Sequence, residues 1–251
     1  MTTNQSGRLV ILTGPSCAGK TPLVRAFRRF WPEQTGALRP VVLRNSRSPR
    51  PSEVDGVEHH FRTRDHIERL HDDERYVVID VRGDLQALDV VELTESLESG
   101  DALYEGNPYV ARELLTNSRL ADIQRLSVFL SPLSKEEIQY LREQPAVSLR
   151  GLTTEMMRRR QLRRGHRLKG MLSAHDLDDA ERRAARAYDE LRMAHEFDLV
   201  IPNHDGEDSE NWDAFYYPLG DARKTLLAVV DLVTGEIPGS AEKWEPDLLP
   251  E

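Results

Sequence analysis

The sequence predicts a three-layer α/β fold with a mainly parallel central sheet. A short apolar run, Leu9 to Leu12, leads into a glycine-rich turn, and an amphipathic segment with helical spacing follows it. Further apolar runs alternate with helical segments along the chain, which is the pattern of a sheet covered by helices. At 251 residues, the chain is long enough to bury a full core.

The expected elements follow from apolar runs and from helix start and stop signals. We expect strands at 9–12, 41–43, 76–81, 101–107, 127–130 and 197–203. We expect helices at 22–30, 65–71, 93–99, 110–115, 177–195 and 224–233. Ser134, with Glu137 three residues further on, predicts a capping box at the start of another helix.

Composition excludes several classes of protein. With 34 basic and 43 acidic residues the formal charge is −9, which disfavours broad binding to nucleic acid or to an anionic membrane. The single cysteine, Cys17, rules out an intrachain disulfide framework and fits a reducing compartment. The sequence has no apolar run near the roughly 18 residues of a membrane span, and its polar start does not resemble a secretory signal. We therefore expect a cytoplasmic protein.

The segment Gly14–Thr21 matches the pattern GxxxxGK[ST] of a phosphate-binding loop. The glycines let successive backbone N–H groups point at phosphate oxygens, Lys20 reaches the β/γ-phosphates, and the Thr21 hydroxyl binds Mg²⁺. A chance match in an ordinary turn is the alternative, which the flanking strand and helix disfavour. We expect this loop to bind a nucleoside triphosphate through Gly14, Ser16, Cys17, Ala18, Gly19, Lys20 and Thr21.

A second motif places two arginines three residues apart in a loop. Arg47 and Arg50 flank Pro49, which fixes the backbone between them. Two guanidinium groups held this way can bind one phosphate with several charged hydrogen bonds. The alternative is that both arginines are solvated loop charges.

In these motifs the sequence resembles the guanylate kinases. That family has a first motif GPSGxGKST, a second motif TTRxPRxGExxGxxYxF and a closing motif FDxVIxN; the corresponding segments here are Gly14–Thr21, 45–61 and Phe197–Asn203. The resemblance covers about residues 8–203. It implies a P-loop kinase fold and Mg²⁺-ATP-dependent phosphoryl transfer to a nucleoside monophosphate. It also implies that Arg47, Arg50 and Glu53 belong to the acceptor site.

The resemblance is weak where the family reads the guanine base. His59 stands in place of the phosphate-binding tyrosine, and it is interpreted either as a phosphate ligand or as a surface residue. Val77 replaces the base-reading glutamate, for which Asp80 or the nearby Asp84 is a substitute candidate. The segment 86–88 and Leu43 lack the hydroxyl groups of the family. The acceptor is therefore left open between GMP and a related phosphorylated compound.

Two further groups complete the implied site. Glu105 ends a strand where the family has an aspartate near the metal, so it joins Thr21 as a metal candidate; the alternative is an ordinary acidic residue at a strand end. The chain is strongly basic from Arg142 to Lys169. By the resemblance this stretch belongs to a lid at about 135–175, whose arginines close over the transferred phosphoryl group. We choose Arg158 from the candidates Arg158 to Arg160 and Arg163. A solvated charged face is the alternative for this stretch.

The resemblance adds two residues near the end of the matched region. Arg183 corresponds to the arginine of RxxxAxxE, which contacts phosphates in the family. Asn203 ends the closing motif and is expected to contact the adenine or ribose of ATP, although it is also a common turn residue at a strand end.

The predicted organisation is a kinase-like domain at 1–234, with an acceptor-binding insert at about 44–100, and an acidic, loose tail at 235–251. An alternative function is a phospho-ligand-binding module without turnover. Such modules typically lose the P-loop lysine, and this chain retains Lys20. A nucleotide-gated RNA-binding or regulatory factor using the arginine cluster is a third class, which the net charge disfavours. A homodimer is compatible with the sequence.

Overall fold

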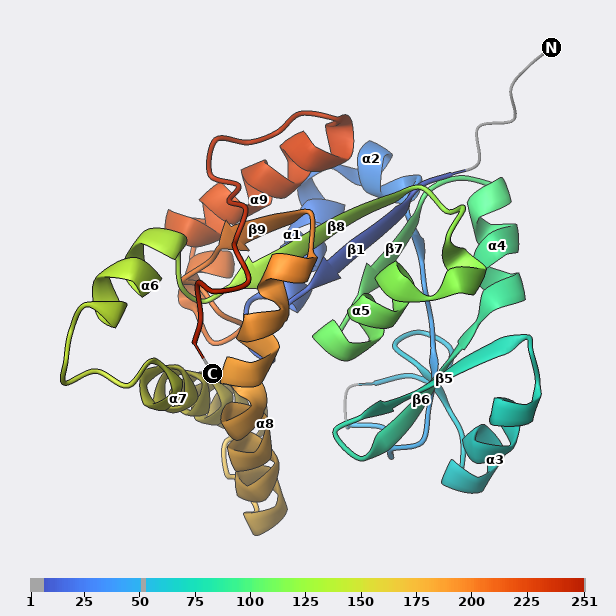
Figure 1. Cartoon of the computed structure of the whole chain (residues 1–251), viewed down its shortest axis with the longest axis horizontal. Helices are drawn as coiled ribbons and strands as arrows, with labels where there is room; N and C mark the ends of the chain where they lie inside the picture. The colour runs from blue at the N-terminus through green and yellow to red at the C-terminus, as the bar shows by residue number, and fades with distance from the viewer. Residues whose placement is uncertain (1–6, 51–52, 251) are drawn as a thin grey trace. The chain divides into compact units, whose positions relative to one another are not determined.

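In the computed structural model of the chain, residues 7–50 and 53–250 are described (Figure 1). The chain divides into two compact units, Met1–Ile11 with Gly36–Leu126 and Leu12–Thr35 with Ser127–Glu251. The predicted insert at 44–100 falls inside the first unit, and the predicted lid at 135–175 falls inside the second. Pro51 and Ser52 of the second motif and the polar residues 1–6 lie outside the described residues.

The central sheet has the strand order β2-β7-β1-β8-β9. Its strands are β1 (Leu9–Thr13), β2 (Arg39–Pro40), β7 (Ala102–Glu105), β8 (Arg125–Ser131) and β9 (Leu199–Pro202). The pairs β2/β7 and β8/β9 are parallel. All five residues of β1 are buried, as expected for a strand covered on both faces. The predicted α/β class with a mainly parallel central sheet is confirmed.

The first unit also contains a four-stranded sheet in the order β4-β3-β6-β5. Its strands are β3 (Arg44–Asn45), β4 (His60–Phe61), β5 (Tyr76–Val81) and β6 (Asp84–Asp89). β5 and β6 form an antiparallel hairpin whose turn residues, Arg82 and Gly83, have φ values of 60° and 92°. Two left-handed residues in succession suit a two-residue hairpin turn. The sequence analysis missed β6, because its residues 85–88 are all buried and show no polar alternation.

Most of the helices begin after a Ser, Thr, Asp or Asn whose side chain accepts a hydrogen bond from a backbone N–H of the first turn. The helices are α1 (Lys20–Phe30), α2 (Pro32–Gly36), α3 (Arg64–Arg69), α4 (Val90–Glu98), α5 (Pro108–Thr116), α6 (Lys135–Arg142), α7 (Leu149–Lys169), α8 (Ala174–Arg192) and α9 (Gly220–Thr234). Ser134 and Glu137 form the predicted capping box of α6. α7 and α8 pack against each other as a helical hairpin (Figure 1). Within the described chain, no helix has the length and apolar character needed to cross a membrane.

The predicted strand at 41–43 is wrong. These residues run between β2 and β3, and their backbone pairs first with one sheet and then with the other. The N–H of Val41 donates to Leu103 in β7 at 2.9 Å, whereas the carbonyl of Leu43 accepts from His60 in β4 at 2.9 Å. The apolar run therefore marks the place where the chain changes sheets.

The predicted loose tail is also wrong for its described residues, 235–250. Glu242 forms an antiparallel bridge with Val200 of β9, with two hydrogen bonds of 2.8 Å. Trp244, Leu248 and Leu249 are buried, with 3–4% of their surface exposed. Their burial stabilises the packed segment, since each large apolar side chain contributes about 1.5–3 kcal/mol when buried. The sequence analysis predicted a loose tail because the segment is acidic, and it missed that these three apolar side chains are buried.

Candidate active site

The phosphate-binding loop connects β1 to α1 and has the backbone that this role requires. Gly14 and Gly19 have φ values of 145° and 98°, which side-chain-bearing residues rarely adopt. A Cβ at Gly14 would also lie 2.4 Å from the carbonyl oxygen of Leu130. α1 begins at Lys20, so its first N–H groups and the positive end of its dipole lie at the loop. The loop therefore has the geometry that holds phosphate oxygens.

Lys20 and Thr21 lie where the motif needs them. The Lys20 ammonium donates to the carbonyl oxygens of Gly14 (2.9 Å) and Pro15 (2.7 Å), and the residue is 8% exposed. This places the cation inside the loop. Thr21 is the second residue of α1 and is exposed, while Ser16 is partly exposed within the loop. All the residues predicted to bind the nucleotide in this loop therefore lie on one continuous segment between β1 and the first turn of α1, and their contacts with a nucleotide stay a prediction.

Cys17 takes the place of a glycine in the family motif and keeps the conformation of one. Its φ of 69° is left-handed, which costs a side-chain-bearing residue roughly 1–2 kcal/mol. Its side chain is buried against Met157 of α7 and Ala187 of α8. Burial raises the pKa of the thiol to about 12, so the group is neutral. Cys17 therefore anchors the loop to the α7–α8 hairpin by an apolar contact.

Asn203 follows β9 and is fully buried. Its Nδ2 donates to the carbonyl oxygens of Ala18 and Asp205, both at 2.8 Å, and its Oδ1 accepts from the Thr225 hydroxyl at 3.2 Å. Both sides of the amide are therefore engaged. The structure places Asn203 as a residue that positions the loop, and the predicted contact with ATP stays a prediction.

The lid arginines have different environments on α7. Arg158 pairs with Glu155 and with Glu181 of α8, and its side chain is 34% exposed. Arg160 is only 5% exposed, and its Nη2 donates to the His204 carbonyl oxygen at 2.8 Å. Its Nη1 is buried without a hydrogen-bond partner in the described part of the chain. Burial lowers the pKa of this guanidinium.

Arg160 lies beside the phosphate-binding loop through Gly206. A Cβ on Gly206 would lie 2.5 Å from the Cys17 carbonyl oxygen and 3.1 Å from Cδ of Arg160. The assignment to Arg158 stays a prediction, whereas this geometry favours Arg160. The burial of Arg160 could be inferred from the sequence, because Thr153, Met157 and Arg160 recur at helical spacing and share the buried face of α7.

Arg47 and Arg50, the arginines predicted to bind the acceptor phosphate, lie in the first unit, and both donate hydrogen bonds to Glu53. Arg47 donates to both carboxylate oxygens of Glu53 at 2.6 Å, and the N–H of Arg50 donates to Glu53 at 2.8 Å. Burial works to raise the pKa of Glu53, but these hydrogen bonds outweigh it and lower the pKa to about 2. Glu53, predicted to bind substrate, is here the common partner of both arginines. A carboxylate thus lies between the two cations predicted to bind a phosphate.

His59 and Asp80, two of the residues predicted to bind substrate, have different surroundings in the structure. Burial and the neighbouring charge of Arg47 lower the pKa of His59 to about 4, so the ring is neutral and supplies no charge at neutral pH. A contact between His59 and the acceptor phosphate stays a prediction. Asp80 is exposed, and it accepts from the Gly83 N–H at 2.9 Å in the β5–β6 turn. This bond helps to hold the turn, and a contact of Asp80 with the substrate stays a prediction.

The remaining candidates lie in different units. Glu105 is the last residue of β7 in the first unit, as predicted. Thr21 and Arg183 lie in the second unit, where Arg183 pairs with Asp179 on α8 at 2.5 Å. Among the described residues, no three His, Cys, Asp or Glu side chains are grouped to hold a metal ion. The predicted binding of Mg²⁺ by Thr21 and Glu105 stays a prediction.

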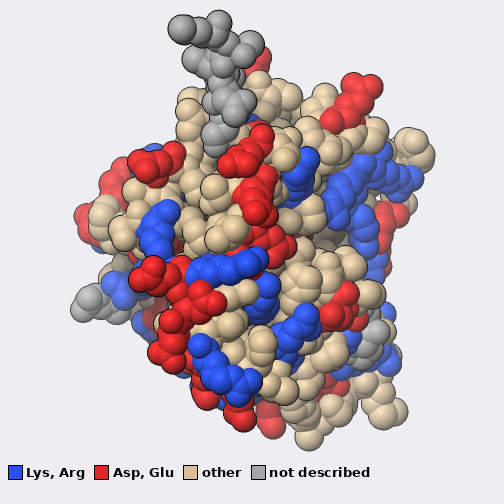
Figure 2. All heavy atoms as spheres, turned by 90° about the vertical axis from the view of Figure 1, so that its right-hand side faces the viewer, with Lys and Arg blue, Asp and Glu red and all other residues tan. Residues whose placement is uncertain are grey.

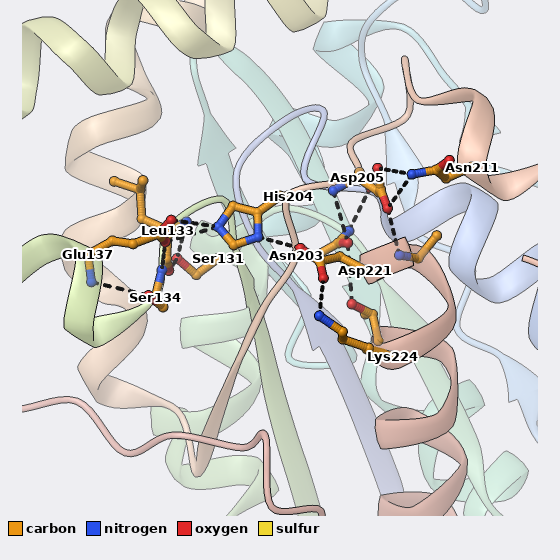
Figure 3. A network of polar contacts seen from close by, with 12 residues as sticks. Ser131, Leu133, Ser134, Glu137, Asn203, His204, Asp205, Asn211, Asp221 and Lys224 are labelled. Atoms are coloured by element: carbon orange, nitrogen blue, oxygen red, sulfur yellow. Dashed lines mark hydrogen bonds and ion pairs between the residues drawn. The ribbon is translucent and has the colours of Figure 1, made fainter. Parts of the chain in front are cut away.

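A polar network missed by the sequence analysis surrounds the end of β9 (Figure 3). His204 lies between two carboxylates, Asp221 of α9 at 2.5 Å and Glu137 of α6 at 2.9 Å. Asp221 also pairs with Lys224 at 2.8 Å. Burial works to lower the pKa of His204, but the hydrogen bonds to Glu137 and Asp221 outweigh it and raise the pKa above 6.5. The network ties the first helix of the lid to α9.

The free energy of unfolding is expected to depend on pH through His204. Because its pKa is raised in the folded state, its stabilising effect is complete below pH 6.5 and is lost as pH rises above that value. We would measure urea unfolding of the wild type and of His204→Gln from about pH 5 to 9. The difference in free energy should be larger near pH 6 than near pH 8. A difference that does not change with pH would contradict the role of the ion pairs.

Comparison with known proteins agrees with these features. The chain is 30% identical over 203 residues to a guanylate kinase of Rhodococcus jostii (strain RHA1), covering 79% of this chain and 81% of that protein. It is 31% identical over 206 residues to a guanylate kinase of Corynebacterium jeikeium (strain K411), covering 80% and 90%. The crystal structure of guanylate kinase from Anaplasma phagocytophilum shares the fold, with a TM-score of 0.52 at 17% identity over 92% of this chain and 86% of that one. No protein-family model matches. The chain belongs to the guanylate kinase family.

Proposed function

We propose that this protein transfers the γ-phosphoryl group of ATP to the phosphate of a nucleoside monophosphate, either GMP or a related acceptor. The observation that carries the proposal is the phosphate-binding loop, which has Lys20 and Thr21 in place at the start of α1. The relatives named guanylate kinase make GMP the first acceptor to test.

On the donor side, the chain supplies positive charge and a fixed geometry. The N–H groups between Gly14 and Gly19 and the Lys20 ammonium would hold the β- and γ-phosphates. The Thr21 hydroxyl would hold Mg²⁺, which neutralises charge on the phosphate oxygens when it is bound. Reaction requires an oxygen of the acceptor phosphate to attack the γ-phosphorus in line, while the bond to the β–γ bridging oxygen of ATP breaks. The products are ADP and the acceptor diphosphate.

On the acceptor side, Arg47 and Arg50 would hold the phosphate of the monophosphate. Glu53 supports this role, because it shows that one anion can contact both residues at once. A phosphate dianion carries more charge than a carboxylate and accepts more hydrogen bonds, so it can replace Glu53 as the partner of the Arg47 guanidinium. Arg47 also lies over the Phe61 ring at 5.4 Å, which limits where its guanidinium can point.

The base of the acceptor has few hydrogen-bonding partners at the positions used by the family. Leu43, Val77 and Leu88 are core residues with 2–5% of their surface exposed. Side chains without polar groups cannot read the edge of guanine. A site that hydrogen-bonds its substrate rejects the wrong one by about 10⁴–10⁵-fold, whereas apolar sites discriminate far less. We therefore propose that base selectivity is weak.

An assay of ADP release over GMP, dGMP, AMP, CMP and UMP tests the function and the selectivity together. At least one nucleoside monophosphate should be phosphorylated, and the best and second-best acceptors should differ by less than about 100-fold in kcat/KM. A preference for GMP of about 10⁴-fold would show that other residues read the base. Absence of turnover with every acceptor, together with tight binding of one of them, would favour the binding-module alternative.

The net charge of −9 and the charges on one face of the molecule favour a small-molecule acceptor over a nucleic acid. On the face drawn in Figure 2, acidic and basic side chains are interspersed. In the first unit, for example, Arg62 pairs with Asp55 and Arg64 with Glu68. A nucleic-acid site would need a continuous basic surface. A cytoplasmic location and a homodimer stay predictions, which fractionation and sizing in solution can test.

A further inference from the structure

The segment at 204–213, here called the acidic strap, follows β9 and crosses the phosphate-binding loop. It begins where the family motif FDxVIxN ends. Gly206 lies so close to the loop that a Cβ on it would be 2.5 Å from the Cys17 carbonyl oxygen. Trp212 is 6% exposed and donates from Nε1 to the carbonyl oxygens of Asp205 and Gly206, both at 3.0 Å. The strap is therefore packed against the phosphate-binding loop and is an ordered part of the second unit.

One side chain of the strap reaches a phosphate-binding amide. Oε2 of Glu207 accepts from the N–H of Gly19 at 2.9 Å. That N–H lies at the amino end of α1, where the helix dipole favours an anion. The Glu207 carboxylate thus makes the contact that the loop offers to a phosphate oxygen. The two anions cannot share one donor, and their charges repel each other.

Three arginines on one face of α7 contact the strap. They follow at positions i, i+3 and i+7, a spacing that places side chains on one side of a helix. The contacts are Arg160 Nη2 to the His204 carbonyl oxygen (2.8 Å), Arg163 Nε to Asp208 (2.7 Å) and Arg167 Nη2 to Asp213 (2.7 Å). The Asp208 side chain is only 7% exposed. Basic side chains of the lid helix are therefore engaged by the strap in this conformation.

We infer that the acidic strap is an internal competitor for ATP, in which Glu207 occupies the phosphate-binding loop until a triphosphate displaces it. The inference rests on the proposed binding of ATP. Binding of ATP must break the contact between Glu207 and Gly19, and so the apparent affinity for ATP is lower than that of the open loop. Movement of Glu207 also loosens the strap from α7, which frees arginines of the lid helix for the incoming phosphates.

Glu207→Gln tests this competition, because it keeps the shape of the side chain and removes its charge. Glu210→Gln is the matched control: Glu210 lies on the same strap and is exposed. Binding of MgATP without acceptor is measured by calorimetry and by the intrinsic fluorescence of the three tryptophans, of which Trp212 has its ring beside Gly19. Glu207→Gln should lower the Kd for MgATP about tenfold, since it removes both repulsion and a charge-assisted contact. Glu210→Gln should leave the Kd unchanged.

Unfolding provides a second measurement. Without nucleotide, Glu207→Gln should be less stable than the wild type, because the contact with Gly19 is weakened. With saturating MgATP, it should gain more stability than the wild type does.

The outcomes separate the inference from the proposed function. If the wild type binds MgATP and Glu207→Gln binds it equally or more weakly, the competition is absent although the function stands. An equal gain in Glu210→Gln would show a general charge effect and would also overturn the inference. Binding only by Glu207→Gln would support it as complete inhibition. If neither protein binds MgATP, the proposed function itself fails.

Discussion

Lys20→Ala is expected to lower kcat/KM for phosphoryl transfer by about 10²–10³-fold or more, with the fold retained. In the structure, the Lys20 ammonium is held inside the loop by the Gly14 and Pro15 carbonyl oxygens. A triphosphate offers charged oxygens in place of these neutral ones, and the gain grows as negative charge moves during transfer. Alanine removes the only side-chain cation that the motif places between the phosphates.

Steady-state kinetics with the best acceptor measure this loss, and far-UV circular dichroism checks the fold. Lys224→Ala is the control, because it removes the same charge from a side chain that is 76% exposed on α9. Its kcat/KM should match that of the wild type. Full activity in Lys20→Ala would exclude the proposed mechanism. A loss confined to the KM for ATP would assign Lys20 to ground-state binding alone.

The sequence predicted the long, apolar strands but not the short ones. The six-residue β5 and the seven-residue β8 are apolar runs, and the sequence analysis found both. β2, β3 and β4 have two residues each and are defined by their neighbours, so no local pattern could locate them. The apolar run at 41–43 was wrongly predicted to be a strand. Its residues connect β2 to β3, where the chain passes from one sheet to the other. Tertiary pairing decided these short elements.

Within the site, local motifs were predictable and partners were not. The phosphate-binding loop is one continuous segment whose spacing carries its geometry. By contrast, the contact of Glu207 with Gly19 joins residues far apart in the chain, and the clamp of His204 between Glu137 and Asp221 joins three elements. Such long-range contacts leave no periodic signal in a sequence. The burial of the Asn203 amide likewise depends on how β9 meets the loop, which no local pattern shows.

Arg160→Ala is expected to lower kcat by about 100-fold, a larger effect than for any other arginine of α7. Arg160 is a cation with 5% of its surface exposed, and within the described residues its Nη1 has no hydrogen-bond partner. Burying a charge with an unfilled donor is costly, so such groups are retained where an anion completes them. Its position beside Gly206 and the phosphate-binding loop makes the transferring phosphoryl group the anion that fits.

Arg158→Ala provides the matched control, since it removes the same group from the same helix. Arg158 is paired with Glu155 and Glu181, and exposed ion pairs of this kind contribute about 0–1 kcal/mol, so its kcat should stay within about twofold of the wild type. Arg160→Lys keeps the charge but not the planar fork, and it should recover only part of the loss. Equal kcat values for Arg158→Ala and Arg160→Ala would contradict the assignment. A fall in kcat with little change in the KM for ATP would place the contact in the transition state, because an arginine that only held the strap would alter nucleotide affinity instead.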